Sequence, residues 1–182
     1  MTRQLTYLAY GSNLHPLRLL KRVPSATLLG VVNLGGQQVV FHKVSPDGSS
    51  KCDLVDAGGR ALAFGALYRI NSSDLPALDA VEGMGSGYDR VHLPLQFRGQ
   101  NLRPFTYRAA ATHIVPGLAP FSWYRDLVME GALYLGLPDF YRRVLAAVTA
   151  KHDPDPIRHD EHAALVRRIR RFGRSAQRGL VS

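Results

Sequence analysis

A short apolar run near the N-terminus stops abruptly at small and polar residues, and this change most constrains how the chain folds. Residues 5–10 are aromatic and aliphatic enough for a buried strand. Gly11 lacks a Cβ and permits a sharp turn, while Ser12 and Asn13 favour turns and helix N-caps. The apolar spacing over residues 14–23 predicts a helix next. This segment is either an ordinary strand-to-helix connection or one that presents backbone N–H groups to an anion.

A second stretch, residues 71–83, predicts a compact helix over residues 74–82. Serines that can cap a helix precede it, and a glycine follows its last residue. At about 100° per residue, Leu75, Leu78 and Glu82 fall within roughly 60° of one another on one face. Glu82 is then either solvated at a fraying helix end or desolvated on the apolar face. Desolvation would raise its pKa toward values that suit acid–base catalysis.

Further motifs follow in order along the chain. They are Glu82-Gly83 with Ser86-Gly87-Tyr88, the tyrosines Tyr107 and Tyr124, and Gly136-Leu137-Pro138 with Tyr141. In order and spacing, residues 7–148 resemble the gamma-glutamylcyclotransferase superfamily, which includes AIG2-like proteins and gamma-glutamylamine cyclotransferases. Residues 10–14, Tyr-Gly-Ser-Asn-Leu, match the signature loop of that family. One departure is Asp89, where several relatives carry an aromatic residue and this chain has its tyrosine one position earlier, at Tyr88.

The resemblance implies an enzyme that releases 5-oxoproline from a small gamma-glutamyl amine or gamma-glutamyl amino acid. The α-amine of the substrate attacks its own γ-carbonyl, so the nucleophile belongs to the substrate, and no metal or organic cofactor is needed. Glu82 is then the catalytic residue that moves the proton. The implied substrate-binding residues are Tyr10, Gly11, Ser12, Asn13, Leu14, Tyr88, Tyr107 and Tyr124. The alternative is a non-catalytic small-ligand binding module of the same fold, with a basic C-terminal tail for an anionic partner.

The order of strands and helices indicates an α+β fold rather than a repeating βαβ unit. Strands are predicted over residues 5–9, 27–34, 37–43, 61–70, 91–97 and 101–109, with a hairpin turn at 98–100 between the last two. Helices are predicted over residues 14–23, 74–82, 121–135 and 139–151. Short strands with hairpins favour a small mixed sheet, curled or closed into a barrel, and the resemblance implies the same barrel flanked by helices.

Length and composition favour one folded domain. The chain has 182 residues, of which 46% are hydrophobic and 20% charged, so disorder is not expected. Its single cysteine, Cys52, excludes an internal disulfide and has no flanking signature of a nucleophile. The N-terminus shows no charged leader followed by a long apolar run, and we therefore expect a cytoplasmic protein. The resemblance is also compatible with a homodimer.

The formal charge of +9 is concentrated near the C-terminus. We expect residues 1–152 to form the catalytic domain and residues 153–182 a basic helix or arm. An apolar stripe of Leu165, Ile169 and Phe172 favours docking on the domain. A free arm would instead bind anions weakly and nonspecifically through Arg167, Arg168, Arg170, Arg171, Arg174 and Arg178. The histidines and acids within residues 152–162 are more typical of a solvated first helical turn than of a metal site.

Overall fold

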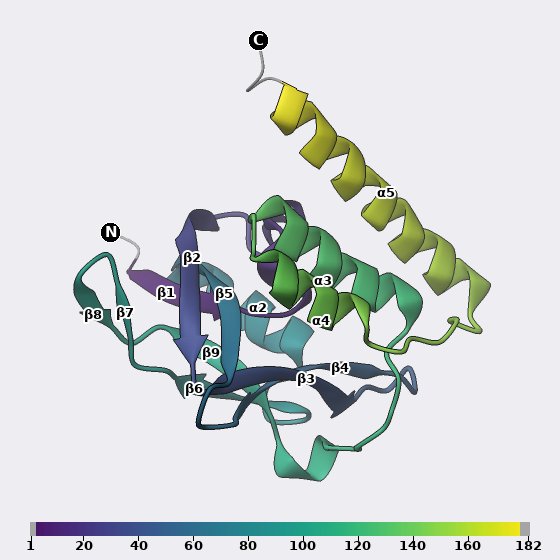
Figure 1. The fold of residues 1–182 in the computed structure, drawn as a ribbon, viewed down its shortest axis with the longest axis horizontal. Helices are drawn as coiled ribbons and strands as arrows, with labels where there is room; N and C mark the ends of the chain where they lie inside the picture. The colour runs from purple at the N-terminus through teal and green to yellow at the C-terminus, as the bar shows by residue number, and fades with distance from the viewer. Residues whose placement is uncertain (1–2, 179–182) are drawn as a thin grey trace.

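The computed structural model describes the backbone of residues 3–178 and the side chains up to residue 172. A five-stranded sheet forms its centre, with the strand order β2-β5-β1-β9-β6 (Figure 1). Neighbouring strands run antiparallel except β1 and β9, which are parallel. The first strand of the sequence therefore lies in the middle of the sheet. The bounds are β1 Gln4–Ala9, β2 Thr27–Gly35, β5 Leu62–Asn71, β6 Tyr88–His92 and β9 Phe105–Ala109.

Two smaller ribbons complete the β-structure. β3 (Gln37–Val44) pairs with β4 (Ser50–Asp56), and β7 (Leu95–Phe97) pairs with β8 (Gln100–Leu102). Within the described residues the outer strands β2 and β6 are not paired with each other, so the sheet is curled and open. The predicted α+β fold is confirmed in its curled form, and the closed barrel is not formed by these strands. The strand β4 was not predicted.

The two strands predicted for the hairpin are each interrupted by a proline. Pro94 separates β6 from β7 and Pro104 separates β8 from β9, because proline has no N–H to donate to a ladder. Between β7 and β8 the chain turns at Arg98 and Gly99, whose φ angles are 50° and 76°. Positive φ at both central residues is typical of a two-residue type I′ hairpin turn, so the predicted turn is present.

The four predicted helices begin near their predicted starts, and the first and the fourth are each five residues shorter than predicted. Pro16 starts the first helix, because residues 12–14 form a separate 3-10 turn before it. The fourth ends at Ala146, ahead of the β-branched Val148 and Thr149, which are poor helix formers. The helices are α1 Pro16–Leu20, α2 Leu75–Glu82, α3 Ser122–Tyr134 and α4 Asp139–Ala146, and the 3-10 turns are η1 Ser12–Leu14, η2 Ser72–Asp74 and η3 Ala111–His113.

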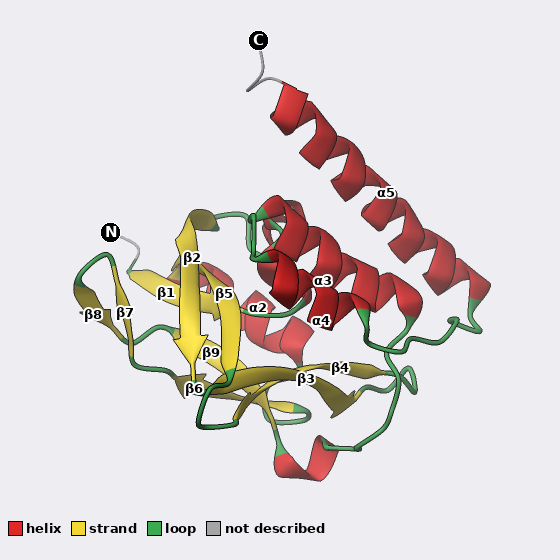
Figure 2. Ribbon diagram, in the orientation of Figure 1, coloured by secondary structure: helices red, strands yellow, loops and turns green. Residues whose placement is uncertain are grey.

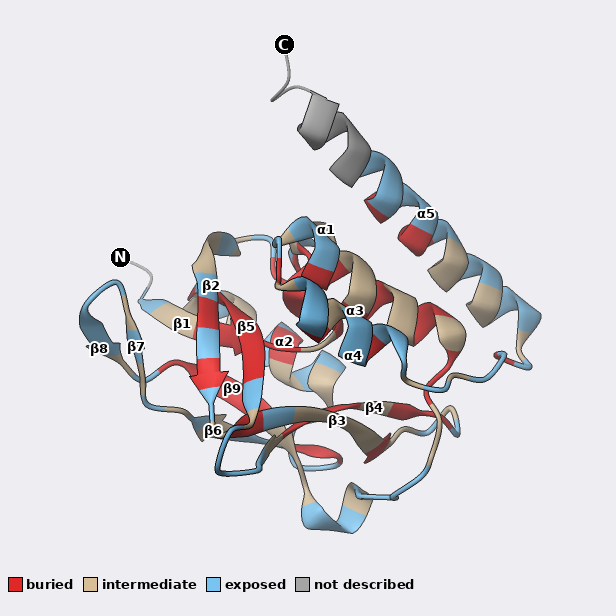
Figure 3. Cartoon of the chain, viewed as in Figure 1, coloured by how far each residue is buried: buried red, intermediate tan, exposed pale blue. Residues whose placement is uncertain are grey.

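The last helix, α5 (Pro156–Arg178), packs on α3, on the side of the molecule where the other large helices gather (Figure 2). Leu165, Val166 and Ile169 are buried, whereas most of the remaining described surface of the helix is exposed (Figure 3). Phe172, part of the predicted stripe, is 43% exposed and lies at the edge of this contact. The side chains of Arg174 and Arg178 lie outside the described residues. No helix in the described part of the chain is long and apolar enough to cross a membrane.

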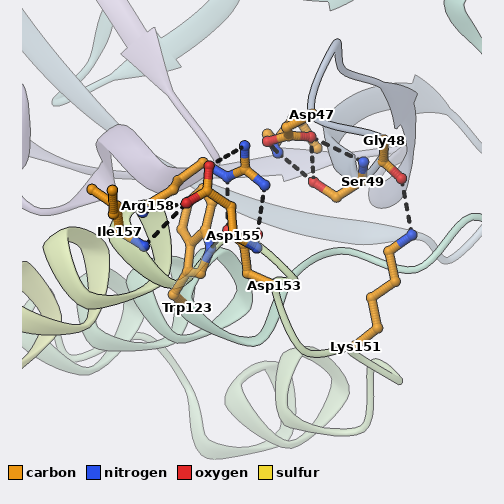
Figure 4. A network of polar contacts seen from close by, with 10 residues as sticks. Asp47, Gly48, Ser49, Trp123, Lys151, Asp153, Asp155, Ile157 and Arg158 are labelled. Carbon is orange, nitrogen blue, oxygen red and sulfur yellow. Dashed lines mark hydrogen bonds and ion pairs between the residues drawn. The ribbon is translucent and has the colours of Figure 1, made fainter.

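A buried carboxylate anchors the chain where it enters α5 (Figure 4). Asp153 accepts hydrogen bonds from Trp123 Nε1 at 2.8 Å and from Arg158 Nε and Nη2 at 2.8 and 2.5 Å. The backbone N–H of Asp155 donates to the same carboxylate at 3.0 Å. Just before it, Lys151 donates to a carbonyl of the β3–β4 turn at 2.9 Å. The acidic segment before α5 therefore ties this helix to α3.

Candidate active site

The signature loop leaves the sheet at the end of β1 and is held from two sides. A Cβ on Gly11 would lie 3.1 Å from the Cβ of Cys52 and 3.5 Å from the Tyr124 hydroxyl, so a glycine permits this close approach. Leu14 is fully buried. Behind it, a Cβ on Gly131 of α3 would lie 2.6 Å from the Leu14 Cβ. The loop is thus fixed between β4 and α3 by two close glycine contacts.

Glu82 is the last residue of α2, and Gly83, with a φ of 67°, ends the helix directly after it. Its Oε1 accepts hydrogen bonds from Asn13 Nδ2 at 2.8 Å and from Arg22 at 3.3 Å. Asn13 joins the group, because it also donates to the Tyr7 hydroxyl at 3.1 Å and accepts from Arg22 at 3.0 Å. Neither alternative considered from the sequence applies, because Glu82 is not freely solvated at the helix end and does not lie on an apolar face without polar partners. Its side chain, 18% exposed, is paired with a cation.

A narrow cavity of about 30 Å³ lies between the loop and Glu82. It brings together all of the predicted site residues except Leu14, which packs in the core behind the loop and accepts a hydrogen bond from Tyr68 at its carbonyl. The lining residues are Tyr7, Tyr10, Gly11, Ser12, Asn13, Cys52, Glu82, Tyr88, Tyr107 and Tyr124. Segments that are far apart in the sequence therefore meet at one carboxylate.

The tyrosines of this cavity are neutral hydrogen-bonding groups. Burial raises the pKa of each phenol above its ordinary value, for Tyr7, Tyr10, Tyr88, Tyr107 and Tyr124 alike. Several of the hydroxyls are also held in place: Tyr107 donates to Asp79 at 2.6 Å, and Tyr124 accepts from the Cys52 N–H at 3.1 Å. Tyr10 donates to the carbonyl of Tyr107, and Tyr88 to that of Cys52. They shape the cavity and do not ionise at neutral pH.

The cysteine in the cavity is also un-ionised. Burial raises the pKa of the Cys52 thiol to about 12, which leaves almost no thiolate to act as a nucleophile at neutral pH. Among the residues that line the cavity, Glu82 carries the one carboxylate. Glu82 is therefore the candidate for proton transfer in this cavity.

Three residues of this site were not predicted as site residues: Tyr7, Arg22 and Cys52. Tyr7 and Cys52 line the cavity, and Arg22 forms the ion pair with Glu82. Tyr7 belongs to β1, shortly before the loop, so its position near the motif is the signal that could have identified it. Nothing in the sequence links Arg22 to Glu82, because the two residues meet only in the folded chain.

The fold and the site define a class of protein. Residues 63–145 match the model of the AIG2-like family. A gamma-glutamylcyclotransferase of Bos taurus is 30% identical over 155 residues, which cover 78% of this chain and 77% of that protein. The gamma-glutamylcyclotransferase of Homo sapiens is 29% identical over 150 residues, with the same coverage. The chain belongs to the gamma-glutamylcyclotransferase family, as the sequence resemblance predicted.

A solved structure agrees with this assignment at the level of the fold. A structure described as gamma-glutamyl cyclotransferase superposes with a TM-score of 0.79 at 23% identity. The match covers 91% of this chain and 99% of that structure. The relatives support an enzyme of the cyclotransferase type.

Proposed function

We propose that this protein releases 5-oxoproline from a gamma-glutamyl substrate by intramolecular attack of the substrate's α-amine. One observation carries the proposal: Glu82, the carboxylate of the cavity, is held 2.8 Å from Asn13 of the signature loop. The neighbouring phenols and the Cys52 thiol are kept neutral by burial, so Glu82 remains to move protons. The relatives named gamma-glutamylcyclotransferase support this chemistry.

In the proposed reaction the cavity folds the gamma-glutamyl unit so that its amine and its γ-carbonyl meet. Glu82 takes a proton from the α-ammonium, and the amine nitrogen forms a bond to the γ-carbon. Protonated Glu82 gives this proton to the leaving nitrogen as the bond from the γ-carbon to that nitrogen breaks. The carboxylate then takes the second proton from the ring nitrogen and passes it to the released amine, which leaves a neutral lactam and an ammonium product. Holding two reacting groups in line can contribute about 7–11 kcal/mol to the barrier reduction.

The remaining residues would position the substrate. We expect the backbone N–H groups of Gly11, Ser12 and Asn13 to face the α-carboxylate and the γ-carbonyl oxygen, since the loop borders the cavity opposite Glu82. The hydroxyls of Tyr107 and Tyr124 would limit the space around the glutamyl chain. The reaction needs no nucleophile from the protein.

The test is a panel of gamma-glutamyl amides, each assayed for 5-oxoproline and for the released amine. We expect 5-oxoproline in equal amount to the amine, and no turnover of the matched substrate whose α-amine is acetylated. Release of the amine from the acetylated compound would exclude amine attack and indicate hydrolysis. Binding without turnover across the panel would favour the non-catalytic binding module instead.

A further inference from the structure

A second, roomier cavity adjoins the one that contains Glu82. Its volume is about 170 Å³, and it shares Ser12, Glu82, Tyr88 and Tyr124 with the first cavity. Because a water molecule takes up about 30 Å³ in the liquid, this space can hold a group of several heavy atoms. A substrate reacting at Glu82 would extend into it. The other residues that line it are Arg18, Arg22, Lys43, Ser45, Lys51, Val81, Trp123 and His162.

The charges that line this second cavity do not balance. Arg22 is paired with Glu82, and Lys51 is paired with Asp47 at 2.7 Å. Arg18 and Lys43 are each 6% exposed, and neither side chain has a hydrogen-bond or ion-pair partner among the described residues. Two buried cations thus remain without counter-ions.

His162 adds no charge to this balance. Burial lowers the pKa of its imidazole to about 4, so the ring is neutral at neutral pH. It stacks on Trp123 with a ring separation of 3.8 Å and forms an aromatic wall of the cavity. The excess of positive charge therefore comes from Arg18 and Lys43.

Burial of these two cations is unfavourable because it removes their charged side chains from water. Burial, together with the neighbouring Arg22, lowers the pKa of Arg18 to about 9, and burial also lowers the pKa of Lys43. With this pKa Arg18 stays charged at neutral pH, in a place where a charge without a counter-ion is unfavourable. The Lys43 Nζ lies 4.8 Å from the centre of the Tyr88 ring, which is not a counter-ion. The structure also makes room for one of them: a Cβ on Gly87 would lie 2.7 Å from the Lys43 Nζ. A site that keeps two such cations is suited to an anionic ligand.

We propose that the second cavity binds a leaving amine that carries two negative charges, namely a dicarboxylic amino acid. Arg18 comes from α1 and Lys43 from β3, so each can take one carboxylate from its own side of the cavity. The proposal rests on the function proposed above, because the amine is the group that Glu82 releases. The sequence places two loops rich in Gly and Pro, residues 83–88 and 112–120, as candidate contacts for this amine, through Met84, Tyr88, His113 and Ile114. Of these four residues Tyr88 lines both cavities, and the other three line neither.

Three substrates of the same shape test the charge requirement. They are gamma-glutamyl-glutamate, gamma-glutamyl-glutamine, which lacks one carboxylate, and gamma-glutamyl-glutaminamide, which lacks both in the leaving group. Because hydrogen bonds to charged groups are the stronger ones, we expect kcat/KM to fall at least about tenfold with each lost charge. Equal kcat/KM for the three compounds would overturn this proposal and leave the cyclotransferase function standing. A failure to form 5-oxoproline from any of them would instead count against the function itself.

A binding measurement tests the cavity without relying on turnover. By calorimetry of the wild-type protein we expect glutamate to bind at least about tenfold more tightly than glutamine, because only glutamate offers the second carboxylate. Equal affinities, or no binding of either amino acid, would overturn the proposal even if the enzyme proved inactive.

Matched variants test whether Arg18 and Lys43 are the groups that bind the carboxylates of the leaving amine. Arg18→Gln and Lys43→Gln keep a polar side chain but remove the charge. The variant of the cation that meets the side-chain carboxylate should lower the ratio of kcat/KM for the glutamate over the glutamine substrate about tenfold, mainly through KM. The variant of the cation that meets the α-carboxylate should lower the ratio for the glutamine over the glutaminamide substrate by a similar factor. Arg60→Gln, at an exposed arginine outside both cavities, is the control and should leave both ratios unchanged. Melting curves identify a variant that fails to fold, and a folded variant that changes neither ratio would contradict that residue's role.

Discussion

Two carboxylates, Asp153 and Glu82, are held in this structure in different ways. At Asp153 both oxygens are used: Oδ1 accepts from Arg158 and the Asp155 N–H, and Oδ2 accepts from Arg158 and Trp123. At Glu82 the two hydrogen bonds, from Asn13 and Arg22, both reach Oε1. Its Oε2 has no hydrogen-bond partner among the described residues. A fully bonded carboxylate is suited to holding structure, whereas one with a free oxygen beside a cavity can exchange a proton.

Exposure separates the two groups in the same way. None of the Asp153 side chain is exposed, whereas 18% of the Glu82 side chain is, at the cavity. Hydrogen bonds from Arg158 hold the pKa of Asp153 well below its usual range, so this group stays ionised. The comparison teaches that burial of an acid does not by itself indicate catalysis. The number of bonded oxygens distinguishes the structural carboxylate of Asp153 from that of Glu82, the proposed proton carrier.

The largest expected effect is that of Glu82→Gln. The amide keeps the shape of the side chain but cannot carry the proton, so we expect kcat to fall by about 10² to 10⁴. The measurement is 5-oxoproline release, with melting curves to show that the fold is intact. Glu161→Gln, an exposed position on α5, is the matched control and should keep full activity. A Glu82→Gln variant that kept more than a tenth of the wild-type rate would show that Glu82 is not the proton carrier, and Glu82 would then not differ from Asp153 in its role.

Asp153→Asn should act on stability instead of chemistry. It removes the ion pair with Arg158, so we expect a loss of about 1.5–3 kcal/mol in the free energy of unfolding at pH 7. Because the pKa of Asp153 is lowered on folding, its contribution is fully present above its ordinary value of 3.8 and is lost as the pH falls below it.

Denaturation at pH 7 and at pH 3 checks this second prediction. The stability difference between the wild type and Asp153→Asn should shrink at the lower pH, because there the carboxylate of the unfolded wild-type chain takes up a proton while that of the folded chain stays ionised. A difference that stays constant between the two pH values would show that Asp153 contributes by packing and not by charge.

The smallest effect is expected at Arg170, which joins α5 to α3 from the outside. Its guanidinium contacts Glu130 at 2.5 Å and Asp126 at 3.3 Å, but 46% of the side chain is exposed. Arg170→Gln should cost about 0.2–1 kcal/mol, and less in high salt, because exposed ion pairs are weak and screened. Urea denaturation at two salt concentrations measures it. A loss as large as that of Asp153→Asn would mean that the outer contacts and not the buried anchor hold α5.

The sequence predicted the parts of this fold that depend on neighbouring residues. The glycine turn after β1, the helix that ends at Gly83 and the turn at Arg98 and Gly99 carry their signals locally. The strand β4 was missed because Lys51 and Asp53 make it look like a continuation of the preceding loop. Its burial also lacks a clean alternation, because Cys52, Asp53 and Leu54 are all buried.

The site was predicted to the extent that it follows a motif. The loop residues from Tyr10 to Asn13 and Glu82 meet at the cavity, as the resemblance implied. Leu14 belongs to the same motif, but its place is in the core. The partners that set the electrostatics, Arg22 and the unpaired Arg18 and Lys43, could not be predicted, because each is brought to Glu82 only by the packing of α1 and β3.

Trp123 has a consequence that reaches beyond its hydrogen bond to Asp153. The same ring contacts the anchor through its Nε1 and stacks on His162 of α5, and both rings line the second cavity. The C-terminal helix is therefore part of the wall against which a leaving group would rest. The segments that supply Glu82 and the loop are separate from this wall. A chain built in this way can change its selectivity by altering its last helix, with the reacting centre left as it is.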